Sequence, residues 1–232
     1  MTRSLNFFLI LFVVLALPHR VFGDEEYIFK AGEEFHYKIL QMGIKSGDAT
    51  LKFVGPKFIN NVDTVLIEFT ADGFNFYDKE SIYVDPTTFK PLTVERDINI
   101  FGKKEKITET YFPQESKIVI QKTVGSKLTE QVLTKSGEVD NIYGFIFRYR
   151  QDGNFKPGDR IDVVLPTKDI KMAVVKKIKL KVEGKNVETF YLESKPAQYK
   201  LWFDTSPLRL PLRISGAIGL ANTVMILKDH KE

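Results

Sequence analysis

The chain has 232 residues, of which 43% are hydrophobic, 12% aromatic and 28% charged, with a formal net charge of +4. This apolar content excludes an intrinsically disordered chain, and the length suits one large domain with a substantial core. Cysteine is absent, which excludes disulfides, thiolate metal sites and thiol catalysis. The near balance of basic and acidic residues carries no nucleic-acid-binding signature, so we expect no nucleic-acid partner.

The first 23 residues are typical of a secretory signal peptide. Arg3 gives a positive start, an unbroken apolar run extends from Phe7 to Leu17, and Gly23 provides a small residue at the expected cleavage point. As a helix the run spans about 16 Å against roughly 30 Å of hydrocarbon, which is short for an anchor. We therefore predict export to the bacterial periplasm or cell envelope with cleavage after Gly23, the alternative being an uncleaved anchor. Residues 24–232 are then a single β-rich domain.

Alternating and β-branched residues predict antiparallel strands through the first half of this domain. The predicted strands are Glu34–Met42, Asp48–Val54, Val62–Ala71, Glu80–Val84, Leu92–Ile100, Lys106–Phe112, Lys117–Val124 and Lys127–Thr134. Turns are expected at Gly43–Gly47 and Gly125–Ser126. A loop after Gly73 is expected to carry three aromatic residues, Phe74, Phe76 and Tyr77.

The periodicity changes after Gly137 and predicts one short amphipathic helix. Apolar residues recur there at the spacing i, i+3, i+4, i+7, at Ile142, Phe145, Ile146 and Tyr149. Asp140 is the expected N-cap, and Gly153 ends the pattern. Gly144 in the middle is unfavourable for a helix. We expect the apolar face to pack against the sheet.

Strand patterns then resume to the end of the chain. They cover Arg160–Leu165, Met172–Val182, Val187–Glu193, Tyr199–Asp204, Leu210–Ser215 and Ala221–Leu227. About a dozen short strands with one helix predict an all-β, mainly antiparallel fold. We expect a strongly curved sheet, as a half-open barrel or a sandwich, with one short amphipathic helix.

A lysine-rich stretch lies in the second half of the domain. Lys177, Lys179 and Lys181 alternate with aliphatic residues, so period two places the three lysines on one face of a strand. Two interpretations remain open: a solvated or Lys-guarded edge strand, and a basic surface stripe that faces anionic lipid headgroups.

No catalytic or metal-binding pattern is present. After removal of the signal only His36 and His230 remain, neither in a recognisable arrangement with a nucleophile, and no GxSxG, SxxK or phosphate-binding loop occurs. Metal sites lack Cys and paired His. Paired carboxylates remain open, because spacing alone does not exclude them among 30 acidic residues. We therefore expect no enzyme and no cofactor, with an envelope hydrolase as the less favoured alternative.

Four stretches of the chain carry a resemblance to a known family: Gly32–Val54 (GEEFHYKILQMGIKSGDATLKFV), Tyr83–Asn99 (YVDPTTFKPLTVERDIN), Val139–Val164, and Lys200–Lys228 (KLWFDTSPLRLPLRISGAIGLANTVMILK). They resemble an exported bacterial family of unknown function, DUF3108. The last is the most specific, with Trp202, Asp204, Arg209, Pro211 and Arg213 in the family's order. The resemblance implies a β-rich fold and an envelope location, but brings no activity or catalytic residues. The basic stretch 171–185 is not a recognised feature of the family.

Aromatic and arginine side chains are the candidate ligand contacts. Tyr143 and Phe147 lie on the predicted helix, where aromatic residues either fill the core or line an apolar cavity. Trp202, Arg209 and Arg213 are the other candidates: the arginines either pair with Asp204 or bind an anionic headgroup. The leading hypothesis is a non-catalytic binding or carrier module for an apolar or lipid-like ligand. The alternative is an envelope scaffold or interaction protein without a cavity, whose partner is an envelope protein or a membrane surface.

Overall fold

The all-β prediction is confirmed by a computed structural model, which describes residues 27–218 and 223–232. The described part contains one α-helix, one short 3-10 helix and fourteen strands. The elements are β1 (Glu34–Gln41), β2 (Ile44–Ile59), β3 (Val62–Gly73), β4 (Phe76–Val84), β5 (Pro91–Ile100), β6 (Lys103–Phe112), η1 (Pro113–Glu115), β7 (Lys117–Val124), β8 (Lys127–Thr134), α1 (Ile142–Asp152), β9 (Arg160–Leu165), β10 (Lys168–Val182), β11 (Lys185–Lys195), β12 (Lys200–Asp204), β13 (Pro211–Ser215) and β14 (Thr223–Lys231). The predicted signal segment lies outside the described residues. No described helix is both long and apolar enough to cross a membrane.

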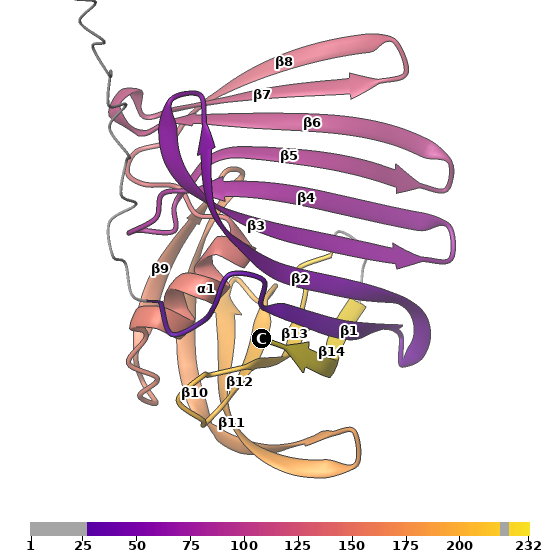
Figure 1. Ribbon diagram of the computed structural model, residues 1–232, viewed down its shortest axis with the longest axis vertical. Coiled ribbons are helices and arrows are strands. Elements are labelled where there is room, and N and C mark those ends of the chain that lie inside the picture. The colour runs from indigo at the N-terminus through magenta and orange to yellow at the C-terminus, as the bar shows by residue number, and fades with distance from the viewer. Residues whose placement is uncertain (1–26, 219–222) are drawn as a thin grey trace, which may run out of the picture.

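All fourteen strands belong to one antiparallel sheet of simple topology. The order is β8-β7-β6-β5-β4-β3-β2-β1-β14-β13-β12-β11-β10-β9, so nearly every strand pairs with its neighbours in sequence, and the first strand pairs with the last. The sheet remains open between β8 and β9, the two strands that α1 connects (Figure 1). Between the two architectures expected, the half-open barrel is therefore the one that forms.

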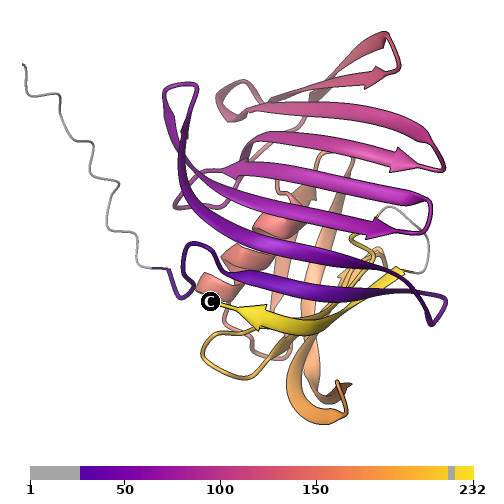
Figure 2. The same cartoon turned by 45° about the vertical axis from the view of Figure 1, so that its right-hand side comes forward.

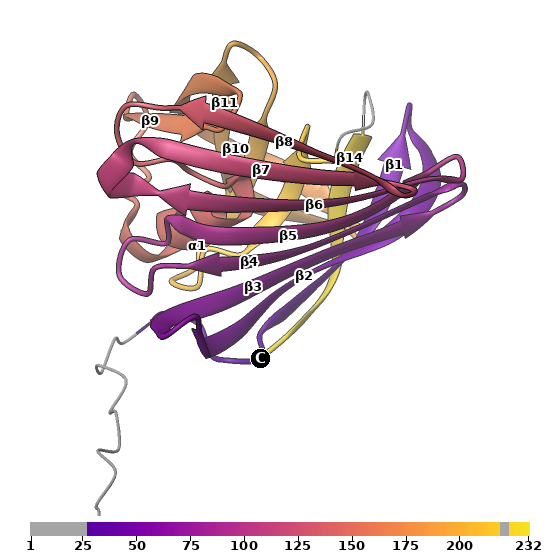
Figure 3. The same cartoon turned by 90° about the horizontal axis from the view of Figure 1, so that it is seen from above.

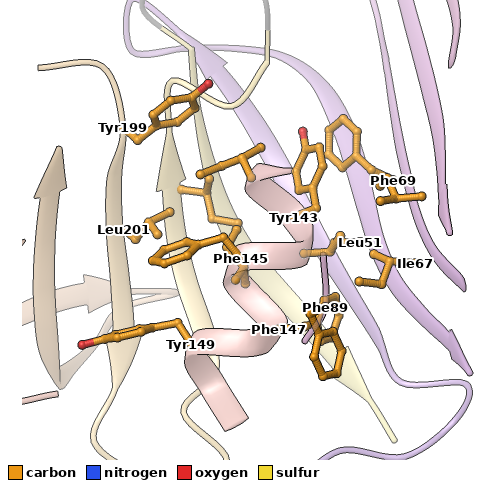
Figure 4. Packing of buried hydrophobic residues seen from close by; sticks show 14 of the residues in the cluster. Leu51, Ile67, Phe69, Phe89, Tyr143, Phe145, Phe147, Tyr149, Tyr199 and Leu201 are labelled. Atoms are coloured by element: carbon orange, nitrogen blue, oxygen red, sulfur yellow. The ribbon is translucent and has the colours of Figure 1, made fainter. Parts of the chain in front are cut away.

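Helix α1 fills the concave face of the curved sheet. Figures 2 and 3 show it between the strands of the two halves, and Figure 4 shows its aromatic side chains reaching both sides. Period-two burial supplies the facing surface: Phe35, Tyr37 and Ile39 of β1 are all at most 1% exposed. The expected packing of the helix on the sheet is confirmed, and the helix is buried on nearly every side.

Two local predictions near the turns are wrong. The turn after β1 is only Met42–Gly43: Ile44, Lys45 and Gly47 already pair with β1, and Gly47 also pairs with β3. Phe76 and Tyr77 belong to β4, so of the three aromatic residues expected in that loop only Phe74 lies in the turn. In both places backbone pairing with neighbouring strands extends the strand beyond its apolar pattern.

The helix cap differs from the prediction by one residue. Asn141 is the N-cap, and its Oδ1 accepts hydrogen bonds from the backbone N–H groups of Tyr143 and Gly144. The Asp140 carboxylate is not available for capping, because it pairs with Lys90 at 2.8 Å and with Arg148 at 2.7 Å.

The connections between strands alternate between the two ends of the sheet. Because β14 pairs antiparallel with β1, the connections β9–β10, β11–β12, β13–β14, β1–β2, β3–β4, β5–β6 and β7–β8 all lie at one end. We call this end the hairpin rim. In Figure 1 its β3–β4 and β5–β6 turns are at the right-hand side.

Candidate functional site

A polar pocket of about 320 Å³ lies between the two halves of the curved sheet, at the N-terminal end of α1. Strands β4, β5 and β6 form one wall, and the hairpin-rim connections β9–β10, β11–β12 and β13–β14 contribute to the other. The side chains and backbone that define it include Glu80, Arg96, Glu109, Tyr111, Gln198 and Gly216. The pocket therefore lies where the curved sheet brings segments distant in sequence face to face.

A buried charged cluster lies on β4 and β5. Asp78 and Glu80 are two residues apart and share the concave face of β4, while Arg96 lies directly opposite Glu80 on β5. Arg96 Nε is 2.7 Å from Asp78 Oδ1 and 3.2 Å from Glu80 Oε1, and Nη2 also donates to Asp78. One guanidinium thus serves two carboxylates.

A third acid extends this cluster onto β6. Glu109 accepts a hydrogen bond from the hydroxyl of Tyr111, two residues further along the same face. Burial raises the pKa of Glu109 above its usual range, although the hydrogen bond from Tyr111 and the charge of Arg96 oppose the shift. The charged cluster therefore has three acids, Asp78, Glu80 and Glu109, against one arginine, and of these four residues Glu80, Glu109 and Arg96 line the pocket.

Glu80 is the most strongly perturbed of these acids. Burial raises its pKa to about 7; Arg96 opposes this shift, whereas the charges of Asp78 and Glu109 add to it. Near neutral pH the Glu80 side chain is thus present in both protonation states. It can donate or accept a hydrogen bond toward a molecule in the pocket.

The pKa of Arg96 is also raised, which in an arginine favours the charged form. Burial disfavours the charged guanidinium of Arg96, but the hydrogen bond to Asp78 and the charge of Glu80 outweigh burial and raise its pKa. Arg96 is therefore a permanent cation at the centre of the cluster.

Tyr143 brings an unsatisfied hydroxyl to the same region. Its ring stacks on Phe69 with centroids 4.3 Å apart (Figure 4), and its buried Oη has no hydrogen-bond partner in the described part of the chain. Burial, with added repulsion from Glu80 and Asp78, keeps its pKa well above the usual range. The hydroxyl thus stays a neutral donor within electrostatic range of the acids.

A second cavity of about 620 Å³ lies on the other side of Tyr111. Its lining includes Leu92, Phe112, Ile118 and Val139, with charged residues such as Lys117 and Glu138 among the other lining groups. Tyr111 lines both cavities. A charged pocket and a more apolar cavity are therefore neighbours across one aromatic side chain.

The two predicted aromatic contacts on α1 have different surroundings. Tyr143 faces the charged cluster, as described above. Phe147 is fully buried among aromatic side chains, with ring centroids 5.1 Å from Phe29 and 5.5 Å from Phe53. Its contacts are those of a core residue.

The other predicted contacts lie away from the pocket. Leu201 and Phe203 point into the core, so Trp202 lies on the opposite, convex face of β12, where the Arg213 guanidinium lies 4.7 Å from its ring centroid. Arg209 donates to the Gly153 carbonyl at 2.8 Å.

The predicted pairing of Arg209 or Arg213 with Asp204 is wrong. Among the described ion pairs Asp204 has none, and its carboxylate instead accepts hydrogen bonds from Ser206 and the backbone of Leu210. The Asp204 carboxylate thus forms its hydrogen bonds within the tight turn that follows β12.

The lysine stripe lies on β10 as the period-two pattern predicts. Lys177, Lys179 and Lys181 are exposed, and the intervening aliphatic residues are partly buried. Strand β9 pairs only with Lys168 to Ala173, so this later part of β10 has β11 as its one described sheet neighbour. The edge interpretation therefore fits this segment.

The sequence reasoning did not single out the residues of the charged cluster. The available signal was the alternation of side chains along the strand: Asp78 and Glu80 share a strand face with the apolar Phe76 and Ile82. Charged residues at inward positions of a strand indicate either a buried ion-pair network or a site.

Comparisons with known proteins define the family and the fold. A family model described as "Protein of unknown function (DUF3108)" matches residues 34–226. No protein with a curated description is significantly similar to the chain. A solved structure, a beta-barrel-like protein of domain of unknown function DUF1849 from Brucella abortus, superposes with a TM-score of 0.51 at 8% identity. That match covers 87% of this chain and 97% of the other, and at this identity it supports the fold alone.

Proposed function

The chain belongs to the DUF3108 family of proteins of unknown function, and we propose that it is a non-catalytic binding or carrier module for an amphiphilic, lipid-like ligand. The polar part of the ligand occupies the charged pocket, and its apolar part occupies the neighbouring cavity.

One observation carries this proposal: Tyr111 lines both the charged pocket of about 320 Å³ and the more apolar cavity of about 620 Å³. Both volumes lie in the range of small-molecule sites. The two adjoining spaces thus offer a polar end and a more apolar end to one amphiphilic ligand.

The charges of the pocket favour one class of headgroup. In the charged cluster Asp78, Glu80 and Glu109 outnumber Arg96, whereas Lys168 lines another part of the pocket, so an anionic headgroup beside the cluster would meet repulsion once the acids ionise. The unsatisfied hydroxyl of Tyr143 adds a neutral donor nearby. A cationic or uncharged, hydroxyl-rich headgroup fits this arrangement best.

The test is ligand detection on protein purified without detergent. Native mass spectrometry should detect a co-purified amphiphile, or dodecyl maltoside and dodecyltrimethylammonium added below their micelle concentrations should raise the melting temperature in a concentration-dependent way. Laurate, with the same chain and an anionic headgroup, should raise it less. If no probe binds and no amphiphile co-purifies, the proposal fails.

Matched variants separate binding from folding. Leu92→Trp fills the apolar cavity and should weaken dodecyl maltoside binding by about tenfold or more. Leu128→Trp places the same side chain on β8, where Leu128 is 62% exposed, and should leave binding unchanged. Equal effects of the two variants would contradict the assignment of the cavity.

The location of this module is a second part of the proposal. The apolar run from Phe7 to Leu17 supports export across the inner membrane with cleavage after Gly23. Cell fractionation and an intact-mass measurement of the protein expressed from the full-length chain test both points. A cytoplasmic protein that retains Met1–Gly23 would reject them.

The raised pKa of Glu80 favours a second candidate function, an acid–base hydrolase. A carboxylic acid near neutral pKa beside a second carboxylate is the arrangement that general acid–base chemistry requires. Chromogenic glycosides and esters test this candidate. Activity that Glu80→Gln lowers by about 100-fold or more would replace the non-catalytic proposal.

A further inference from the structure

Large apolar side chains are exposed on three successive turns of the hairpin rim. The exposed fractions are 82% for Met42 on the β1–β2 turn, 74% for Ile44 at the start of β2, 83% for Phe74 on the β3–β4 turn and 76% for Phe101 on the β5–β6 turn. Single exposed apolar residues are common on protein surfaces, but four on adjacent turns form a group.

Backbone hydrogen bonds tie these turns to one another. The N–H of Phe74 donates to the Ser46 carbonyl at 3.1 Å, which joins the second turn to the strand after the first. The N–H of Phe101 donates to the Asn75 carbonyl at 2.8 Å, which joins the third turn to the second. The three turns that carry the four residues therefore form one continuous edge (Figure 1, right-hand side).

Two of these residues occupy backbone conformations that do not suit them. Met42 and Phe101 each have a φ of 51° and precede a glycine with positive φ. Asn is the preferred residue at such a position, and the β2–β3 turn of this chain uses Asn60 and Asn61. Local turn energetics and water exposure both disfavour Met and Phe there, so folding alone does not explain them.

The charge at the same edge is positive. The turn segments 42–45, 73–75, 101–104 and 125–127 contain lysines at positions 45, 103, 104 and 127 and no acidic residue. The nearest acids are the exposed Asp72, which directly precedes the second segment, Asp48, which pairs with Lys45 at 2.9 Å, and Glu105, which pairs with Lys103 at 2.8 Å. Apolar tips flanked by lysines are complementary to a bilayer surface with anionic headgroups.

We propose that the hairpin rim docks on the surface of an anionic phospholipid bilayer, with Met42, Ile44, Phe74 and Phe101 entering the boundary between headgroups and acyl chains. A fluid apolar phase accepts side chains on separate projecting tips, whereas a protein partner would need a matching recess for each. The proposal does not depend on ligand binding in the pocket. It would orient the rim connections that line the pocket toward the lipid.

Vesicle flotation of the full chain tests this inference. The protein should float with vesicles of phosphatidylethanolamine and phosphatidylglycerol, and less with phosphatidylcholine alone. The triple variant Met42→Asn, Phe74→Asn, Phe101→Asn should lower the bound-to-free ratio by about tenfold or more, because three inserted apolar side chains are lost. Its melting temperature should stay equal or rise, because Asn suits the positive φ at positions 42 and 101.

A matched control removes apolar residues elsewhere. Val132→Asn with Val175→Asn changes two exposed residues in the middle of β8 and β10, neither of them on a turn of the hairpin rim, and should leave flotation unchanged. Failure of the unmodified protein to float, or equal flotation of the triple variant, would overturn the proposal. The proposal would also be overturned if sedimentation showed that the chain self-associates through the rim, that the triple variant abolishes this self-association, and that the protein does not bind vesicles.

Discussion

Arg150 on α1 forms a buried ion pair with Glu33, the residue before β1: Nη1 lies 2.7 Å from Oε2 and Nη2 lies 2.9 Å from Oε1. Their side chains are 0% and 1% exposed. Arg150 also donates to the Leu208 carbonyl before β13, and Glu33 lies 2.9 Å from the His230 ring in β14. The pair therefore joins the central helix to the first strand, to the last strand and to the β12–β13 connection.

Breaking this pair on one side should strongly destabilise the protein. Glu33→Gln leaves the buried guanidinium without a counter-charge, for which we expect a loss of about 3–5 kcal/mol in the free energy of unfolding by urea. Lys30→Gln, which removes an exposed partner of Glu232, is the control and should cost less than about 1 kcal/mol. The double change Glu33→Leu with Arg150→Met should cost less than the sum of its single changes, and strict additivity would contradict the coupling.

The charged cluster should make stability depend on pH. Because burial raises the pKa of Glu80 from 4.5 to about 7, the folded state holds a proton that the unfolded state releases between these values. Stability should therefore fall as pH rises through this window. In Glu80→Gln the free energy of unfolding should decrease less between pH 4.5 and 8 than in the unmodified protein, by on the order of 1 to 3 kcal/mol, as measured by urea unfolding. The exposed Glu138→Gln is the control, and an unchanged slope in Glu80→Gln would reject the assignment.

Gly144 should not tolerate alanine although it lies inside a helix. Intrinsic propensity favours alanine by about 1 kcal/mol. However, a Cβ at this position would lie 2.8 Å from the Phe89 carbonyl oxygen, which is closer than side-chain carbons approach. We expect Gly144→Ala to lower the free energy of unfolding by about 1–3 kcal/mol. A stabilised variant in thermal and urea unfolding would mean that the helix does not pack this closely.

The two residues before α1 should have separable roles. Asn141→Ala removes the helix cap and a hydrogen bond to Glu80, and should cost about 1–2 kcal/mol. Asp140→Asn keeps the side-chain size but leaves Lys90 and Arg148 without their shared buried partner, so it should cost more. Urea unfolding of both variants tests this order, and a larger loss for Asn141→Ala would contradict it.

The strand-rich class, the single helix and most strand positions followed from the sequence alone. Burial with period two is a local property, so strands such as Lys117–Val124 and Arg160–Leu165 match their predicted bounds. Local patterns failed where a neighbouring strand decided the outcome, as at Ile44 to Gly47, and where a tertiary ion pair took Asp140 away from the helix cap.

Only the tertiary structure brought the candidate site together. Asp78, Arg96 and Glu109 lie on three strands, and each looks locally like an ordinary charged residue in an alternating segment. They meet because antiparallel register aligns their inward positions. The curve of the sheet around α1 then brings this wall opposite connections that are distant in sequence, such as the one that contains Gly216. Composition and periodicity thus determined what kind of sheet forms, whereas strand register and curvature decided which buried charges share a pocket.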